Sequence, residues 1–187
     1  MHKRTLTGRA NTHFLTFSTQ GRRRLLDSSA CRRIVISYLS KAASERGAHV
    51  SAFVVMPDHV HALMWFDDDS VLPEFVKIWK KMSSHYMIKH LREFSPSMVE
   101  HLKVRRNGRE IVAVWNRRYY DYYLPDAGKA REKINYIHEN PVRQGLVSRA
   151  EEWTWSSAPW YLHGRSVGVK IEPGFLKLHY TAPAHSY

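Results

Sequence analysis

The sequence predicts an α+β fold, with a mostly antiparallel sheet and helices packed on it. Short segments rich in β-branched and aromatic residues alternate with longer segments whose apolar residues recur at helical spacing. Only Pro57 and Asp58 join the second and third strand-like segments, a link too short for a parallel crossover, so these strands are expected to be antiparallel. Asn107 and Gly108 stand between strand-like flanks and predict a hairpin.

The elements are expected in the order strand, helix, strand, strand, helix, hairpin, strand, helix. Strands are predicted at residues 13–19, 48–56, 59–66 and 115–124, the hairpin within 101–115, and helices from 27–29 to 47, over 71–94, and from 127 to 139 or 140. Pro141 disfavours helical geometry at the preceding residue, so Asn140 is expected at the very end of the last helix. This order resembles the split βαβ, ferredoxin-like arrangement.

The length of 187 residues predicts a single domain over 1–187, with a C-terminal extension from about residue 150. Residues from about 176 to 187 are expected to be disordered. The basic start, residues 1–9, lacks the apolar core of a secretory signal, and no apolar run reaches the length of a membrane span. A single cysteine, Cys31, excludes an internal disulfide framework and suits a cytoplasmic protein.

The charge indicates a polyanionic partner. Lys and Arg total 29 against 17 Asp and Glu, a net charge of +12, which favours nucleic acid over a merely basic or ribosome-associated protein. Residues 117–123 mix arginines with tyrosines on which unpaired bases can stack, although the same pattern suits a half-buried strand. The candidates for contacts with a DNA backbone are Arg22, Arg23, Arg24, Lys77, Lys80, Lys81, Arg105, Arg106, Arg117 and Arg118.

Two histidines stand two positions apart in the third predicted strand. Side chains alternate along a strand, so His59 and His61 point to the same face and can converge on one ion. A core strand gains little from two imidazoles that need polar partners, although such a pair also occurs in ordinary structural or surface roles. Asp58 is expected to point to the opposite strand face and to hold the turn. A metal site needs a third ligand, and catalysis needs a nucleophile.

The last predicted helix supplies both candidates. Tyr136 and Asn140 are four residues apart and therefore share one helix face, whereas His138 faces another side and is a poorer ligand candidate. An amide oxygen suits Mg²⁺ or Mn²⁺, and imidazole suits Mn²⁺ and other transition ions. A phenol is a weak nucleophile, but a nearby cation favours phenolate and orients a phosphate. Alternatively, Tyr136 packs on the sheet and Asn140 simply ends the helix.

Two motifs together carry a family resemblance. Met56-Pro57-Asp58-His59-Val60-His61 is followed by the segment from Tyr136 to Val147, with further matching residues at 115–121 and 152–157. This combination resembles the single-tyrosine HUH transposases, and most of all the REP-associated tyrosine transposases. The resemblance covers about residues 12–161 and is far more specific than either motif alone.

The resemblance implies a ferredoxin-like HUH fold in which His59, His61 and Asn140 bind a divalent ion, Mg²⁺ or Mn²⁺. Tyr136 would cleave single-stranded DNA, leaving a 5′-phosphotyrosine link and a free 3′-OH, and the protein would then transfer the strand without ATP. The implied substrates are hairpin-forming repetitive extragenic palindromes with a short guide tetranucleotide. A cytoplasmic, nucleoid-associated monomer or homodimer is expected. Two alternatives remain: a non-catalytic hairpin-binding protein or regulator, and a zinc hydrolase that uses water.

Overall fold

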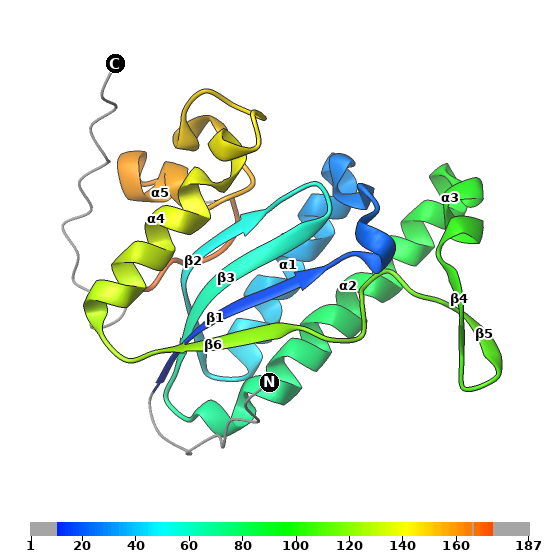
Figure 1. Ribbon diagram of the computed structural model, residues 1–187, viewed down its shortest axis with the longest axis horizontal. Helices are drawn as coiled ribbons and strands as arrows, with labels where there is room; N and C mark the ends of the chain where they lie inside the picture. Colours follow the sequence, from blue (N-terminus) through cyan, green and yellow to red (C-terminus); the bar gives the residue numbers. More distant parts are fainter. Residues whose placement is uncertain (1–10, 166, 174–187) are drawn as a thin grey trace.

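The computed structural model of the protein describes residues 11–165 and 167–173, and it has the predicted α+β fold (Figure 1). The basic start and the segment predicted to be disordered, residues 176–187, lie outside the described residues. The strands are β1 Asn11–Ser18, β2 Ala48–Val55, β3 His59–Phe66, β4 Lys103–Arg106, β5 Arg109–Val112 and β6 Tyr120–Leu124. The helices are α1 Ser29–Glu45, α2 Leu72–Phe94, α3 Pro96–His101, α4 Ala127–Arg143 and α5 Ala158–His163.

The main sheet has the strand order β2-β3-β1-β6, and every neighbouring pair in it is antiparallel. Strands β1 and β2 therefore run parallel to each other with β3 between them, which confirms the split βαβ, ferredoxin-like arrangement. The β4–β5 hairpin forms a separate two-stranded sheet beyond the end of α2 (Figure 1). Its turn residues Asn107 and Gly108 both have positive φ, 49° and 76°, as the Asn-Gly signal predicted.

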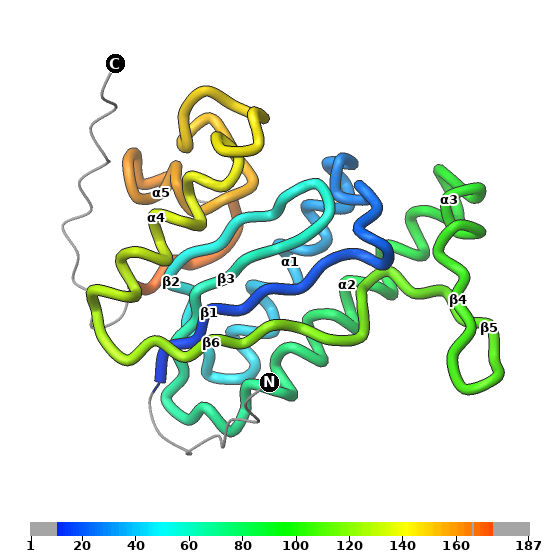
Figure 2. Tube along the Cα trace, in the orientation of Figure 1, coloured from blue at the N-terminus to red at the C-terminus, as the bar shows by residue number. Residues whose placement is uncertain are grey.

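Helices cover both faces of the main sheet (Figure 2). Alternate residues of β3, namely Val60, Ala62, Met64 and Phe66, join the larger apolar cluster together with residues of α1 and α2. Leu63 points the other way and joins a smaller cluster with Ile134 and Ile137 of α4. His59, His61 and Leu63 are alternate residues of β3, so their side chains point to the same face of the sheet, the one that α4 covers.

The end of α4 differs from the prediction. The helix continues through Pro141 to Arg143, so Asn140 lies inside its last turns and not at its very end. Because Pro141 has no backbone N–H, the helix loses one hydrogen bond near its C-terminal end, the bond to the carbonyl of Ile137. Beyond it the backbone N–H of Gln144 donates to the carbonyl of Asn140 at 3.1 Å.

The C-terminal extension packs along the β2 edge. Val54 forms an isolated antiparallel bridge with Ser156, and Val50 a parallel one with Ile171. Helices α3 and α5 were not predicted; each has only six residues, too few for a periodic pattern to be recognised. Within residues 11–165 and 167–173, no helix combines the length and apolar character needed to cross a membrane.

Candidate active site

The histidine pair lies at the start of β3, next to β1. In the β1–β3 register, His59 is opposite Ser18 and His61 is opposite Thr16. The two histidines are only 5% and 6% exposed, and their ring centroids lie 4.8 Å apart. The strand alternation predicted from the sequence therefore brings both imidazoles to one face, at the end of the sheet nearest the β2–β3 turn.

The Nδ1 atoms of the pair are held by neighbouring side chains. His61 Nδ1 is hydrogen-bonded to the Thr16 hydroxyl at 2.7 Å, and His59 Nδ1 donates to an oxygen of Asp58 at 2.6 Å. The second Asp58 oxygen accepts a bond from Arg22 at 3.0 Å. No hydrogen bond within the described residues uses the Nε2 atom of either histidine. A partner on Nδ1 that orients the ring is typical of histidines that bind a metal through Nε2.

These contacts also set the protonation states of the site. Burial lowers the pKa of His61 to about 3, and the neighbouring cations Lys133 and Arg22 add to the effect. The ring is thus neutral at pH 7, the form that can ligate a metal. Burial alone would raise the pKa of Asp58, but the bonds from His59 and Arg22 hold it below its usual value. The prediction that Asp58 points away from the pair was therefore wrong, because its carboxylate turns back to His59.

Tyr136 stands over the histidine pair from α4. Its ring centroid is 5.4 Å from that of His61 and 5.9 Å from that of Phe14, which itself stacks on His61. Two cations flank the phenol ring: the Arg143 guanidinium carbon lies 4.6 Å from its centroid, and the Lys133 ammonium 5.3 Å. One chain thus brings the candidate nucleophile, the histidine pair and two positive charges together.

Asn140 follows Tyr136 by one helical turn and is buried. Its side-chain oxygen accepts a long bond, 3.5 Å, from Gln144, and no hydrogen bond joins it to either histidine among the described residues. His138 lies on another side of α4, as expected from its spacing. It is fully buried, its Nε2 is 2.8 Å from the Ser157 hydroxyl, and burial lowers its pKa to about 3.

The candidate DNA contacts fall into groups with different surroundings. Several are exposed but already paired with a carboxylate in the chain: Arg22 with Asp58, Arg24 with Asp27, and Lys77 with Glu74. Arg23 donates to the backbone carbonyl of Gln20. Arg105 and Arg106 lie on the β4–β5 hairpin, and Arg117 and Arg118 precede β6.

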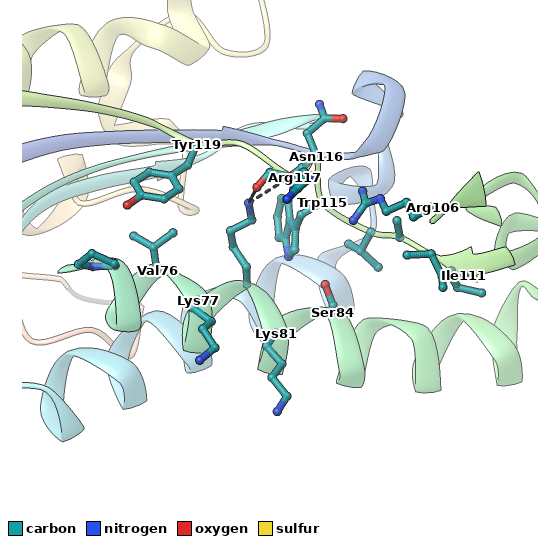
Figure 3. Close-up of a pocket in the computed structure, with 15 residues that line it drawn as sticks. Val76, Lys77, Lys81, Ser84, Arg106, Ile111, Trp115, Asn116, Arg117 and Tyr119 are labelled. Carbon is teal, nitrogen blue, oxygen red and sulfur yellow. Dashed lines mark hydrogen bonds between the residues drawn. The ribbon is translucent and has the colours of Figure 1, made fainter. Parts of the chain in front are cut away.

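Lys80 has a role inside the fold. It lines a pocket of about 370 Å³ between α2 and residues 111–119, and its ammonium donates to the carbonyls of Asn116 and Arg117 at 2.8 and 3.0 Å (Figure 3). Burial lowers the pKa of Lys80 to about 8. Figure 3 shows Lys77 and Lys81 extending from α2 away from Trp115. Lys80 therefore holds the segment before β6, whereas Lys77 and Lys81 face outward.

Four residues of the site were missed as contributors by the sequence reasoning: Thr16, Lys133, Arg143 and, as a partner of His59, Asp58. Lys133 and Arg143 had a usable signal, because they stand three residues before and seven after Tyr136 on the same helix face. Thr16 had none, since its approach to His61 depends on the register of β1 against β3.

The sequence of the chain matches a family of transposases. The sequence model of the family described as "Transposase IS200 like" matches residues 8–140, more than half of the chain. The chain therefore belongs to the IS200-like transposase family, and the histidine pair, Tyr136 and Asn140 all lie within the matched segment.

Similar proteins are described as REP-associated tyrosine transposases. A protein from Haemophilus influenzae, assigned provisionally to the REP-associated tyrosine transposases, is 27% identical over 107 residues, 57% of this chain and 56% of that protein. The chain thus spans a little over half the length of that relative. The REP-associated tyrosine transposase of Escherichia coli K12 is 22% identical over 152 residues, 80% of this chain and 77% of that protein.

A solved structure shares the fold. It is a REP-associated tyrosine transposase bound to a REP hairpin, with a TM-score of 0.66, 19% identity and 93% of each chain covered. The predicted resemblance to REP-associated tyrosine transposases is confirmed by these matches.

Proposed function

We propose that the protein is a metal-dependent single-stranded DNA endonuclease and strand transferase that acts through Tyr136. The observation that carries the proposal is the 5.4 Å separation of the Tyr136 and His61 rings within one chain. A tyrosine that served only to pack α4 on the sheet would not need two imidazoles with free Nε2 atoms and two flanking cations beside it.

In the proposed reaction the Tyr136 oxygen attacks a DNA phosphate. An oxygen–phosphorus bond forms, the bond from phosphorus to the 3′ oxygen breaks, the phenol proton passes to solvent, and the leaving oxygen takes up a proton as a 3′-OH. The product is a 5′-phosphotyrosine link, which preserves the bond energy. A 3′-OH of another strand can then attack that link, which restores a phosphodiester and frees the tyrosine. Lys133 and Arg143 lie where they can offset the charge of the phosphate.

The residues fit a divalent ion, Mg²⁺ or Mn²⁺. His59 and His61 present free Nε2 atoms and oriented rings, and Asn140, one turn from Tyr136, would supply the third, amide ligand. The described residues contain no group of three or more His, Cys, Asp and Glu side chains placed to hold a metal. When bound, the ion would polarise and orient the phosphate.

The proposed substrate is single-stranded DNA that folds into hairpins of the repetitive extragenic palindrome type. The support comes from the relatives, which are described as REP-associated, and from the solved structure that holds a REP hairpin. The net charge of +12 suits such a polyanion. Nucleoid association would follow from this substrate.

The test compares the wild-type chain with Tyr136→Phe on a hairpin oligonucleotide with single-stranded flanks, in Mn²⁺ or Mg²⁺. We expect a denaturant-resistant protein–DNA adduct with the wild type only, while hairpin binding stays within about twofold in the variant. A variant that cleaves at the normal rate would show that Tyr136 is not the nucleophile. Product without any adduct would indicate hydrolysis by water, and binding without product a non-catalytic hairpin-binding protein.

A mixing experiment tests whether one chain is sufficient. Tyr136→Phe lacks the nucleophile and His59→Ala lacks one imidazole, so neither is expected to form an adduct alone. Because the site is assembled within one chain, the mixture is expected to remain inactive. Adduct formed by the mixture would instead indicate a homodimer in which the tyrosine helix of one chain serves the histidines of the other.

A further inference from the structure

Two tyrosines on the edge strand β6 have no part in the site described above. Tyr120 and Tyr122 are 57% and 44% exposed, and their rings are nearly parallel, with 6.5 Å between centroids and 3° between planes. They lie on the α4 face of the sheet, because Leu124, the next residue in the same alternation, packs in the α4 cluster. The open edge thus presents aromatic faces on the side of the sheet that carries the histidine pair.

A shallow, open cleft of about 710 Å³ lies beside this edge, and its lining includes Thr16, Arg118 and Tyr120. Thr16 is opposite His61 on one side and Tyr120 on the other, and its hydroxyl is bonded to His61. The tyrosine edge and the histidine pair are therefore linked through one residue of the middle strand.

Three cationic side chains lie near the two tyrosines. The Lys133 ammonium is 5.8 Å from the Tyr122 ring centroid and 5.3 Å from that of Tyr136, so it stands between the edge and the candidate nucleophile. Arg117 and Arg118, which line the cleft, are exposed. Unlike Arg22 and Arg24, none of these three cations forms an ion pair with a carboxylate among the described residues.

We propose that Tyr120, Tyr122 and Lys133 form a subsite for the unpaired nucleotides that adjoin the scissile phosphate. The two rings stack on bases, and Lys133 and Arg118 face the phosphates. Such stacking tolerates any sequence, because every base has a π face. The inference rests on the proposed function, since Tyr136 and the histidines define where the scissile phosphate lies. Unpaired cations beside the rings favour nucleic acid over an uncharged protein surface.

The test is a double-mutant cycle between rings and bases. Fluorescence anisotropy measures binding of a hairpin oligonucleotide with an unpaired flank to the full chain carrying Tyr136→Phe, so that cleavage does not intervene. The flank is intact or carries abasic sites, and the protein keeps both tyrosines or carries Tyr120→Ala with Tyr122→Ala. We expect either change alone to weaken binding about 10-fold or more, and both together to weaken it no further.

Two controls separate stacking from loss of structure. Tyr120→Phe with Tyr122→Phe keeps both rings and is expected to bind within about twofold of the parent. Tyr86→Ala removes an exposed ring that stacks on Tyr38 at 5.1 Å, on the helices of the other face, and is expected to change nothing. Thermal unfolding of each variant verifies that the fold is kept.

Additive losses from ring and base removal, or no loss at all, would overturn the subsite. So would a change in oligomeric state on removing the rings without coupling to the bases, because the edge would then hold a second copy of the chain. These outcomes are separate from failure of the catalytic proposal, which is read from the adduct in the wild-type chain. Coupling in a chain that forms no adduct would still support the subsite as a DNA-binding surface.

Discussion

The two faces of the sheet differ in how completely they are covered. The face under α1 and α2 carries the larger apolar cluster, in which Phe17 packs on Trp79 in a T-shaped arrangement and Phe75 packs on Trp79 in a tilted one. The face under α4 carries a smaller cluster, and α4 packs over β2 and β3 and leaves β6 at the open edge (Figure 1). The exposed Tyr120 and Tyr122 lie on this edge strand. The larger set of stabilising apolar contacts therefore lies on the α1–α2 face, and the candidate catalytic residues lie on the α4 face.

This separation has a direct consequence for substitutions. Residues on the closed face are held by neighbours on every side, so their loss should be felt by the whole fold. Tyr136 and Lys133 on the α4 face are only half-buried, so their substitution should be felt in DNA binding or cleavage more than in stability.

Trp79→Ala should be the most damaging single change to stability. Trp79 is fully buried, contacts Phe17 and Phe75, and donates from its indole to the Val35 carbonyl at 2.9 Å. Truncation leaves a cavity and should lower the free energy of unfolding by about 3–5 kcal/mol in urea titrations. Tyr136→Phe, on the other face, should change it by less than about 0.5 kcal/mol. Equal losses for the two would contradict the division.

Asp58→Asn and Thr16→Val should weaken the metal site while the fold stays stable. Each removes a group that orients one imidazole through its Nδ1 atom, and such partners are worth roughly 10–100-fold in metal affinity. Calorimetric titration with Mn²⁺ measures the effect. Asp27→Asn is the matched control, because Asp27 pairs with Arg24 on the surface. Unchanged affinity in both site variants would show that the imidazoles do not depend on these partners.

Lys133→Ala should reduce DNA binding through charge. Lys133 lies beside the Tyr136 ring, so we expect the salt dependence of single-strand binding to fall by about 0.7 in slope, the value for one phosphate contact. Lys129→Ala removes an equal charge from α4, but that lysine is already paired with Glu132. We expect a smaller change for the control. An unchanged slope in Lys133→Ala, or an equal decrease in both variants, would contradict a specific phosphate contact by Lys133.

Glu172→Gln should have the smallest effect. Bonds from Lys170 and His49 lower the pKa of Glu172, so its ionised form stabilises the folded chain. That stability is present above the unfolded pKa, near 4.5, and is lost as pH falls below it. Because the pair is partly exposed, the effect should be at most about 1 kcal/mol. Urea titrations at pH 7 and pH 3 should show a smaller loss of unfolding free energy in the variant than in the wild type. An identical loss would show that Glu172 does not contribute to this pH dependence.

Much of the fold was readable from local pattern. Strand alternation, the two-residue link at Pro57 and Asp58 and the Asn107–Gly108 turn each act over a few residues, so they predicted the central strands and the hairpin. The continuation of α4 past Pro141 could not be predicted from the sequence. It depends on the small number of helical hydrogen bonds that a proline so close to the end of the helix affects.

The site was readable as residue types and spacing, not as geometry. His59, His61, Tyr136 and Asn140 were predicted from spacing and family resemblance. The approach of Tyr136 to His61 arises from the packing of α4 on Phe14 and Leu63, which joins distant parts of the chain. The turn of Asp58 onto His59 depends on a side-chain rotamer, which a one-dimensional pattern does not encode.

The most direct test of the central claim is to locate the covalent link. The wild-type chain is incubated with a single-stranded hairpin oligonucleotide and Mn²⁺, the adduct is digested with protease and nuclease, and the modified peptide is sequenced by mass spectrometry. The account predicts a nucleotide phosphate on Tyr136. A link to any other residue, such as the exposed Tyr120 or Tyr122, would contradict it.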